Sequence, residues 1–277
     1  MKNWLKSQKI SEKHKQRRSK AVVGCFTLLL ALCLSSSCSQ SRKTTHILFV
    51  GNSYTYRNNM PKLFEKIAES KGEQVSVTHI TRGKYTFYLQ SRRQKLYHAL
   101  KNQTWDVIVL QGSSRDMLRD SARFRNKTYP ALDKMLGAIR KNQRSARVYF
   151  YMTWPYRKGD PTNEQFSSPD SMLRAVAAGY RNLAKRYKVP VIPVGKVWRN
   201  YAVAYPETNL YTSDNSHPSF EGSYLVACTM YSAIYGKTPL GADRPAIQNQ
   251  DELNRIQQFT GKQIGKKYFR DLLSDSI

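Results

Sequence analysis

The stretch HILFVGNSYT, residues 46–55, sets the pattern for the whole chain. A short apolar β run ends at Gly51, polar residues follow, and Pro61 opens an amphipathic helix that stops at Gly72. The run WDVIVLQG at 105–112 is apolar throughout, as in a strand covered on both faces. Further strands are expected at 74–80, 147–152 and 189–195, and further helices at 86–102, 130–143, 170–187, 197–204, 220–235 and 251–273.

This alternation of strands and helices predicts one α/β domain with three layers, α/β/α, and a mostly parallel sheet. The sequence shows no internal repeat and no second type of composition, so the predicted domain covers 46–277. Right-handed crossovers place the loops that follow the strands at one edge, where open α/β sheets bind ligands. Functional residues are therefore expected in loops 52–60, 81–86, 112–129, 153–169 and 206–219.

The composition of the 277 residues excludes several protein classes. With 40% hydrophobic and 23% charged residues, the chain is not disordered, collagenous or a polytopic membrane protein. Its formal net charge of +27 is unusual. Residues 1–20 carry eight Lys or Arg and one acid, Glu12, and the rest is still strongly basic. Such a charge concerns partners and solubility, and not the fold.

The N-terminal sequence predicts an export signal. Residues 21–34, AVVGCFTLLLALCL, follow a basic stretch and are shorter than the roughly 20 apolar residues that span a bilayer. Small residues and Cys38 come next, an order that resembles a bacterial lipoprotein signal. The resemblance implies a signal peptide at 1–37, acylation of Cys38, a tether at 38–45, and an exported protein anchored by lipid to the envelope membrane. A soluble export signal or an uncleaved anchor are the alternatives.

Cysteine usage excludes a disulfide scaffold in the processed chain. Cys25 and Cys33 lie in the predicted signal, and a lipid would block Cys38. Only Cys228 then remains, so no intramolecular bridge can form. Its setting, YLVACTMYSAIY, is apolar, which predicts a buried and unreactive thiol.

Ser53 and His217 are the candidate chemical groups. Ser53 follows the first strand beside a glycine that permits a sharp turn, but a serine hydroxyl needs a base to become a nucleophile. Among the five histidines, His217 alone combines a predicted strand-end loop with a nearby acid, in SDNSHPS at 213–219. Asp214, three residues earlier, can fold back onto the imidazole, fix its tautomer and stabilise its protonated form. The structural alternatives are that Ser53 is an ordinary turn serine and that Asp214 caps a helix beside a surface histidine.

GNSYT near the start and DNSHPS near the end resemble the SGNH (GDSL-type) hydrolases over about 46–236, and in particular an exported Bacteroidetes-type branch with Asn in place of Asp before the serine. The resemblance implies Ser53 as nucleophile, His217 as base, Asp214 as orienting acid and a flavodoxin-like fold. It also implies an oxyanion hole built from the backbone N–H groups of Ser53 and Gly83. The family's third block has an asparagine donor, and Gln111 is its expected substitute here.

Two residues are expected to bind substrate. Trp154, after the fourth strand, either stacks on a sugar ring or belongs to the core. Arg115 opens a basic group that continues at Arg119, Arg123, Arg125 and Lys127. This group either holds an acidic glycan or forms a solvated face near anionic lipid headgroups.

The expected function is a serine esterase of the envelope that deacetylates carbohydrate, acting on a small-molecule or glycan ester. The alternatives are a catalytically silent glycan-binding lipoprotein and an O-acyltransferase. The sequence shows no metal-ligand spacing, no phosphate loop and no nucleic-acid module, so neither a metal or other cofactor nor a nucleic-acid partner is expected. The oligomeric state stays open.

Overall fold

The computed structural model describes residues 43–118 and 121–263 of the protein. The predicted signal peptide, most of the predicted tether, the lipidation at Cys38 and the predicted helix beyond Gln263 lie outside these residues.

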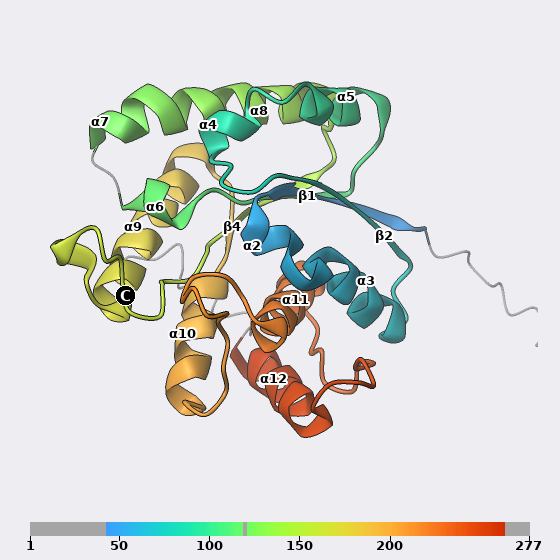
Figure 1. Ribbon diagram of the computed structural model, residues 1–277. Helices are drawn as coiled ribbons and strands as arrows, with labels where there is room; N and C mark the ends of the chain where they lie inside the picture. Colours follow the sequence, from blue (N-terminus) through green and yellow to red (C-terminus); the bar gives the residue numbers. More distant parts are fainter. Residues whose placement is uncertain (1–42, 119–120, 264–277) are drawn as a thin grey trace, which may run out of the picture. The chain divides into compact units, whose positions relative to one another are not determined.

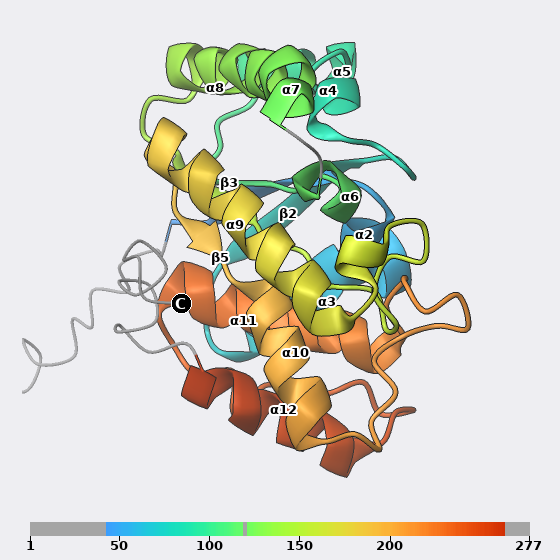
Figure 2. The ribbon, with the colours of Figure 1, turned by 90° about the vertical axis from the view of Figure 1, so that its left-hand side faces the viewer.

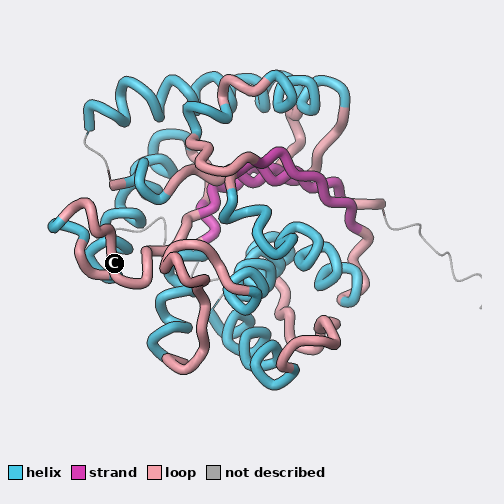
Figure 3. The backbone as a smooth tube through the Cα atoms, in the orientation of Figure 1, coloured by secondary structure: helices cyan, strands magenta, loops and turns pink. Residues whose placement is uncertain are grey.

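Five parallel strands form one sheet in the order β2-β1-β3-β4-β5. This is the order of flavodoxin-like folds, and it confirms the predicted fold class. Figure 3 shows the strands as a magenta band with helices above and below it. The strands are β1 (Thr45–Gly51), β2 (Val75–Thr81), β3 (Val107–Leu110), β4 (Arg147–Tyr151) and β5 (Val191–Ile192). The fifth is shorter than expected because Pro190 and Pro193 flank it and supply no N–H to a ladder.

Helices of very different length connect the strands. The longer helices are α3 (Met60–Ser70), α5 (Gln94–Asn102), α8 (Tyr129–Asn142), α9 (Pro169–Tyr187), α10 (Val194–Ala204), α11 (Phe220–Tyr235) and α12 (Gln250–Gln263). The short ones are α2 (Ser53–Tyr56), α4 (Phe87–Gln90), α6 (Ser114–Met117) and α7 (Ser121–Arg123), with 3-10 turns η1 (Arg57–Asn59) and η3 (Glu164–Phe166) and a π turn η2 (Phe124–Thr128).

The predicted helix 86–102 is broken into α4 and α5. Ser91 ends α4, and its hydroxyl donates to the Tyr88 carbonyl at 2.9 Å. The Tyr97 hydroxyl donates to the Ser91 carbonyl at 2.6 Å. These side chains satisfy backbone groups outside the helical ladder, which is why the apolar periodicity alone missed the break.

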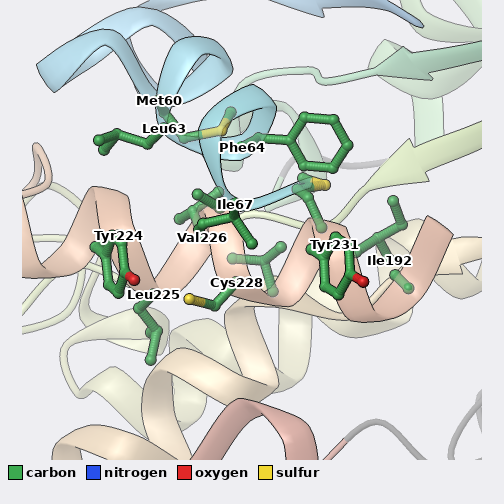
Figure 4. Packing of buried hydrophobic residues seen from close by; sticks show 14 of the residues in the cluster. Met60, Leu63, Phe64, Ile67, Ile192, Tyr224, Leu225, Val226, Cys228 and Tyr231 are labelled. Carbon is green, nitrogen blue, oxygen red and sulfur yellow. The ribbon is translucent and has the colours of Figure 1, made fainter. Parts of the chain in front are cut away.

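One face of the sheet is covered by α3, α10 and α11, with α12 packed on the outside of α11 (Figure 1). Helix α11 is buried on almost all sides, so its sequence is apolar all round rather than striped. Phe64 and Ile67 of α3 pack against Val226 of α11 in this layer (Figure 4). Cys228 is fully buried here, which confirms the predicted setting of that thiol.

The other face is covered by α4, α5, α8 and α9, whose apolar side chains pack on Leu48 and Val50 of β1. The chain thus passes to one layer after β1, through α3, and to the opposite layer after β3, through α8. The crevice between the carboxyl ends of β1 and β3 is therefore the switch point where open α/β sheets bind ligands. Figure 2 shows α2 and the loop before α11 on the same side of the sheet, at this edge.

Candidate active site

A tight turn joins β1 to α2 and presents Ser53. Asn52 caps α2 with its side-chain oxygen, which accepts the Tyr54 backbone N–H at 3.0 Å. Its amide nitrogen donates to the Tyr85 carbonyl at 2.9 Å and so ties the turn to the loop after β2. Gly51 must be glycine, because a Cβ there would lie 2.3 Å from the Thr55 hydroxyl oxygen. Ser53 is 8% exposed, at the first position of the helix.

The three residues expected to act together do meet. The Ser53 hydroxyl oxygen lies 2.8 Å from His217 Nε2. On the other side of the ring, His217 Nδ1 lies 2.5 Å from Asp214 Oδ2. The second oxygen of Asp214 accepts the backbone N–H groups of Ser216 and His217 at 2.9 and 2.8 Å. The nucleophile is thus within hydrogen-bond reach of the base, and the base is within hydrogen-bond reach of the orienting acid.

The electrostatics suit this order of groups. Partial burial acts to raise the pKa of the Asp214 carboxyl, but the hydrogen bonds from the backbone and ring of His217 outweigh it, and the pKa lies well below its ordinary value. Asp214 is therefore a carboxylate at neutral pH. A carboxylate accepts the proton of Nδ1–H, which leaves the lone pair of Nε2 facing the Ser53 hydroxyl.

The loop after β2 brings Gly83 beside the Ser53 turn. The Arg82 backbone N–H donates to the Gly51 carbonyl at 3.2 Å, one step before Gly83. Ser53 begins α2, so its own backbone N–H has no acceptor within the helix. The oxyanion role of the Ser53 and Gly83 N–H groups stays a prediction.

The expected oxyanion role of Gln111 stays a prediction, and the hydrogen bonds of this residue, which is 1% exposed, show a structural role. Its side-chain oxygen accepts the Asn52 backbone N–H at 2.8 Å and the Thr55 hydroxyl at 2.9 Å, and its nitrogen donates to the Gly112 carbonyl. The amide oxygen and one amide N–H of Gln111 thus support the nucleophile turn. The signal for this role is the position of Gln111 directly after β3, the strand paired with β1.

Gln111→Leu is expected to lower stability and kcat together. The change leaves the Asn52 N–H and Thr55 hydroxyl unpaired, at about 1–3 kcal/mol for each buried group. A fall in melting temperature of about 2–4 °C for each kcal/mol follows, measured by thermal unfolding. The control is Gln94→Leu at an exposed position of α5. A loss of kcat at an unchanged melting temperature would instead favour the oxyanion role.

Trp154 is fully buried, so it cannot stack on a sugar, and the core alternative is confirmed. Its two faces are covered by Tyr54, at 4.4 Å between ring centroids, and Trp198, at 4.1 Å. Its indole nitrogen donates to the Ser216 carbonyl at 3.0 Å, and the Tyr54 hydroxyl lies 2.5 Å from the Ser216 hydroxyl. The Tyr54 ring also contacts the His217 ring edge to face. This aromatic column, Tyr54–Trp154–Trp198, holds the loop that carries His217, a role that sequence reasoning missed.

Arg115 lies beside the site, and its guanidinium already pairs with a carboxylate of the protein. Its guanidinium makes a forked contact with Asp160, at 2.9 Å and 3.2 Å, and also reaches the Thr162 hydroxyl. Arg115 also lines a pocket of about 400 Å³ that borders Asp214 and Ser216. Asp160 therefore occupies two of the guanidinium donors, and a direct substrate-binding role for Arg115 stays a prediction. Of its expected companions, Arg119 lies outside the described residues and Arg123 pairs with Asp116 at 3.4 Å.

Other groups add no further chemistry to this site. Within 43–118 and 121–263, no three His, Cys, Asp or Glu side chains gather as a metal site would require. Burial raises the pKa of the Cys228 thiol far above its ordinary value. No helix in the described part of the chain is long and apolar enough to cross a membrane.

Comparison with known proteins places this geometry in context. Residues 49–225 match the model of the GDSL-like Lipase/Acylhydrolase family. A DUF4886 family protein from Bacteroides uniformis superposes with a TM-score of 0.70 at 15% identity, covering 82% of this chain and 96% of its own. A candidate SGNH hydrolase from Slackia heliotrinireducens does so with a TM-score of 0.54 at 25% identity, covering 69% and 100%.

An acetyl xylan esterase, AlAXEase, superposes with a TM-score of 0.52 at 21% identity, covering 68% of this chain and 99% of its own. At these identities, the likeness to the Bacteroides protein and to AlAXEase shows a shared fold. No curated protein matches the sequence significantly.

Proposed function

This chain belongs to the GDSL-like lipase/acylhydrolase family, and from that premise we propose that it is a serine ester hydrolase with Ser53, His217 and Asp214 as its catalytic triad. The observation that carries the proposal is the contact of 2.8 Å between the Ser53 hydroxyl and His217 Nε2, with Asp214 behind the ring. A turn serine and a surface histidine far apart in sequence have no structural need to meet in this way.

The geometry supports acyl transfer in two halves. His217 Nε2 takes the Ser53 proton as the oxygen attacks the ester carbonyl, and the carbonyl electrons move onto its oxygen. The backbone N–H groups of Ser53 and Gly83 are the proposed donors to that oxyanion. When the intermediate collapses, His217 returns its proton to the leaving alcohol. Water then attacks the acyl-enzyme by the same route and releases the acid and free Ser53.

Acetylated carbohydrate is the proposed substrate. Support comes from the fold shared with AlAXEase, itself an acetyl xylan esterase, and from the export signal expected in the sequence. The proposed setting is likewise the cell envelope, with a lipid on Cys38 holding the protein at a membrane.

A fluorophosphonate probe tests the proposal, because it bonds covalently to an activated serine and loses fluoride. We expect one adduct, on the peptide that contains Ser53, by mass spectrometry. Ser53→Ala is expected to abolish the adduct. Ser76→Ala, at the opposite end of β2, is expected to keep it. A native protein that takes up no probe on Ser53 would favour the catalytically silent glycan binder.

A further inference from the structure

The segment that supplies the Gly83 loop carries no negative charge. Between Glu73 and Asp106 the sequence contains no Asp or Glu, while its basic residues are Arg82, Lys84, Arg92, Arg93, Lys95 and Lys101. The loop between β2 and α4 comes to the same edge of the sheet as α2 (Figure 2). A positive potential therefore lies next to the proposed nucleophile.

Two of these arginines share one aromatic ring. The guanidinium carbons of Arg82 and Arg93 each lie 5.4 Å from the centroid of the Tyr85 ring. Cation–π contact at this range holds each guanidinium group against the Tyr85 ring. We call Arg82, Tyr85 and Arg93 the arginine clamp.

The arginine clamp is attached directly to the nucleophile turn. The Tyr85 carbonyl accepts the Asn52 side-chain amide at 2.9 Å, and the Arg82 backbone N–H donates to the Gly51 carbonyl at 3.2 Å. Asn52 and Gly51 are the two residues before Ser53. The clamp therefore lies next to the nucleophile turn.

The clamp also lacks an anion. In the described part of the protein, neither Arg82 nor Arg93 makes an ion pair, and Arg93 Nη1 is buried with no hydrogen-bond partner. Both guanidinium groups are therefore without a carboxylate of the protein's own, which leaves them able to pair with an anionic group of a substrate. Arg115 differs, because Asp160 already fills its fork. The clamp is thus the better candidate for the anion-binding role first expected of Arg115.

We propose that the arginine clamp is a subsite for the carboxylate of a uronic acid in an acetylated glycan. The proposal rests on the proposed esterase function and narrows its substrate class to acidic polysaccharides. Guanidinium groups bind carboxylates through two parallel hydrogen bonds, and the position next to Ser53 sets the carboxylate close to the acetylated sugar.

The test compares acetate release from acetylated polygalacturonate and acetylated xylan. In the native protein, kcat/KM is expected to favour the acidic polymer and to fall with added salt. Arg82→Gln, at an exposed position, is expected to reduce the ratio of the two kcat/KM values by about tenfold or more, because a hydrogen bond to a charged group is lost. Arg93→Lys, which keeps the charge but not the fork, is expected to reduce it as well. The control is Lys101→Gln at the far end of α5, with no change in the ratio.

Binding separates this proposal from the proposed function. Ser53→Ala is expected to bind de-esterified oligogalacturonate, measured by calorimetry, and Ser53→Ala with Arg82→Gln to bind it about tenfold more weakly or worse. This readout stands even if no ester is hydrolysed. Equal effects of Arg82→Gln on both polymers, together with unchanged binding, would overturn the subsite. A second contradictory outcome is an Arg82→Gln variant that loses binding to vesicles of anionic lipid but keeps the native glycan affinity. That result would assign the clamp to a membrane surface.

Discussion

Replacing Ser53 with alanine is expected to lower kcat for p-nitrophenyl acetate by at least about 10³-fold, because removal of the nucleophile leaves only binding and oxyanion stabilisation. The Ser53 hydroxyl contacts His217, and the cap of α2 is made by Asn52, so the turn is expected to keep its shape. Initial rates and thermal unfolding of native and variant proteins check both statements. KM carries little information here, since residual turnover does not pass through an acyl-enzyme.

The matched control is Ser76→Ala, which changes the same atoms on β2 far from the carboxyl edge. Its kcat is expected to equal that of the native protein. Identical rates for the native protein and Ser53→Ala would remove the hydrolytic function and leave the silent glycan binder.

Asp214→Asn is expected to reduce kcat by about 10²–10⁴-fold with a small change in KM. An asparagine oxygen can still accept the backbone N–H groups of Ser216 and His217. Its NH₂ group then faces Nδ1 and donates to it, so the ring proton moves to Nε2. That tautomer cannot take the Ser53 proton, and the imidazolium formed in the transition state loses its partner. Steady-state kinetics measure the loss of kcat. The control is Asp251→Asn, at an exposed position of α12.

The pH dependence of stability gives an independent check. The folded-state pKa of Asp214 is lowered, so its contribution to stability is fully present above the ordinary carboxyl pKa of about 4 and is lost as pH falls through the lower folded pKa. The difference in melting temperature between the native protein and Asp214→Asn is therefore expected to shrink as the pH falls below about 4. A difference that grows below that pH would contradict the low pKa.

The sequence predicted the fold and the meeting of the triad residues because both follow from local signals. Apolar runs bounded by glycine located the strands, and one topological rule sent the loops after them to one edge. Ser53 lies in the loop after β1. His217 lies in the loop between α10 and α11, which this rule does not cover, and Asp214 is three residues before it.

The sequence did not show the contacts of three other site residues, because their partners are distant in sequence. Gln111 bonds to Asn52, Trp154 stacks on Trp198, and Arg115 pairs with Asp160. The sequence showed that these side chains can take part in amide hydrogen bonding, ring stacking and carboxylate pairing. No local pattern says whether the protein itself or a ligand supplies the partner.

The aromatic column has a spectroscopic consequence. Trp154 and Trp198 lie parallel within 7°, close enough for their excited states to couple, and Trp154 is bonded to the backbone of the residue before His217. The other tryptophan in the described ranges, Trp105, lies before the start of β3, at the other end of that strand from the column. Indole fluorescence and near-ultraviolet circular dichroism therefore report the conformation of the loop that carries His217 without any added label.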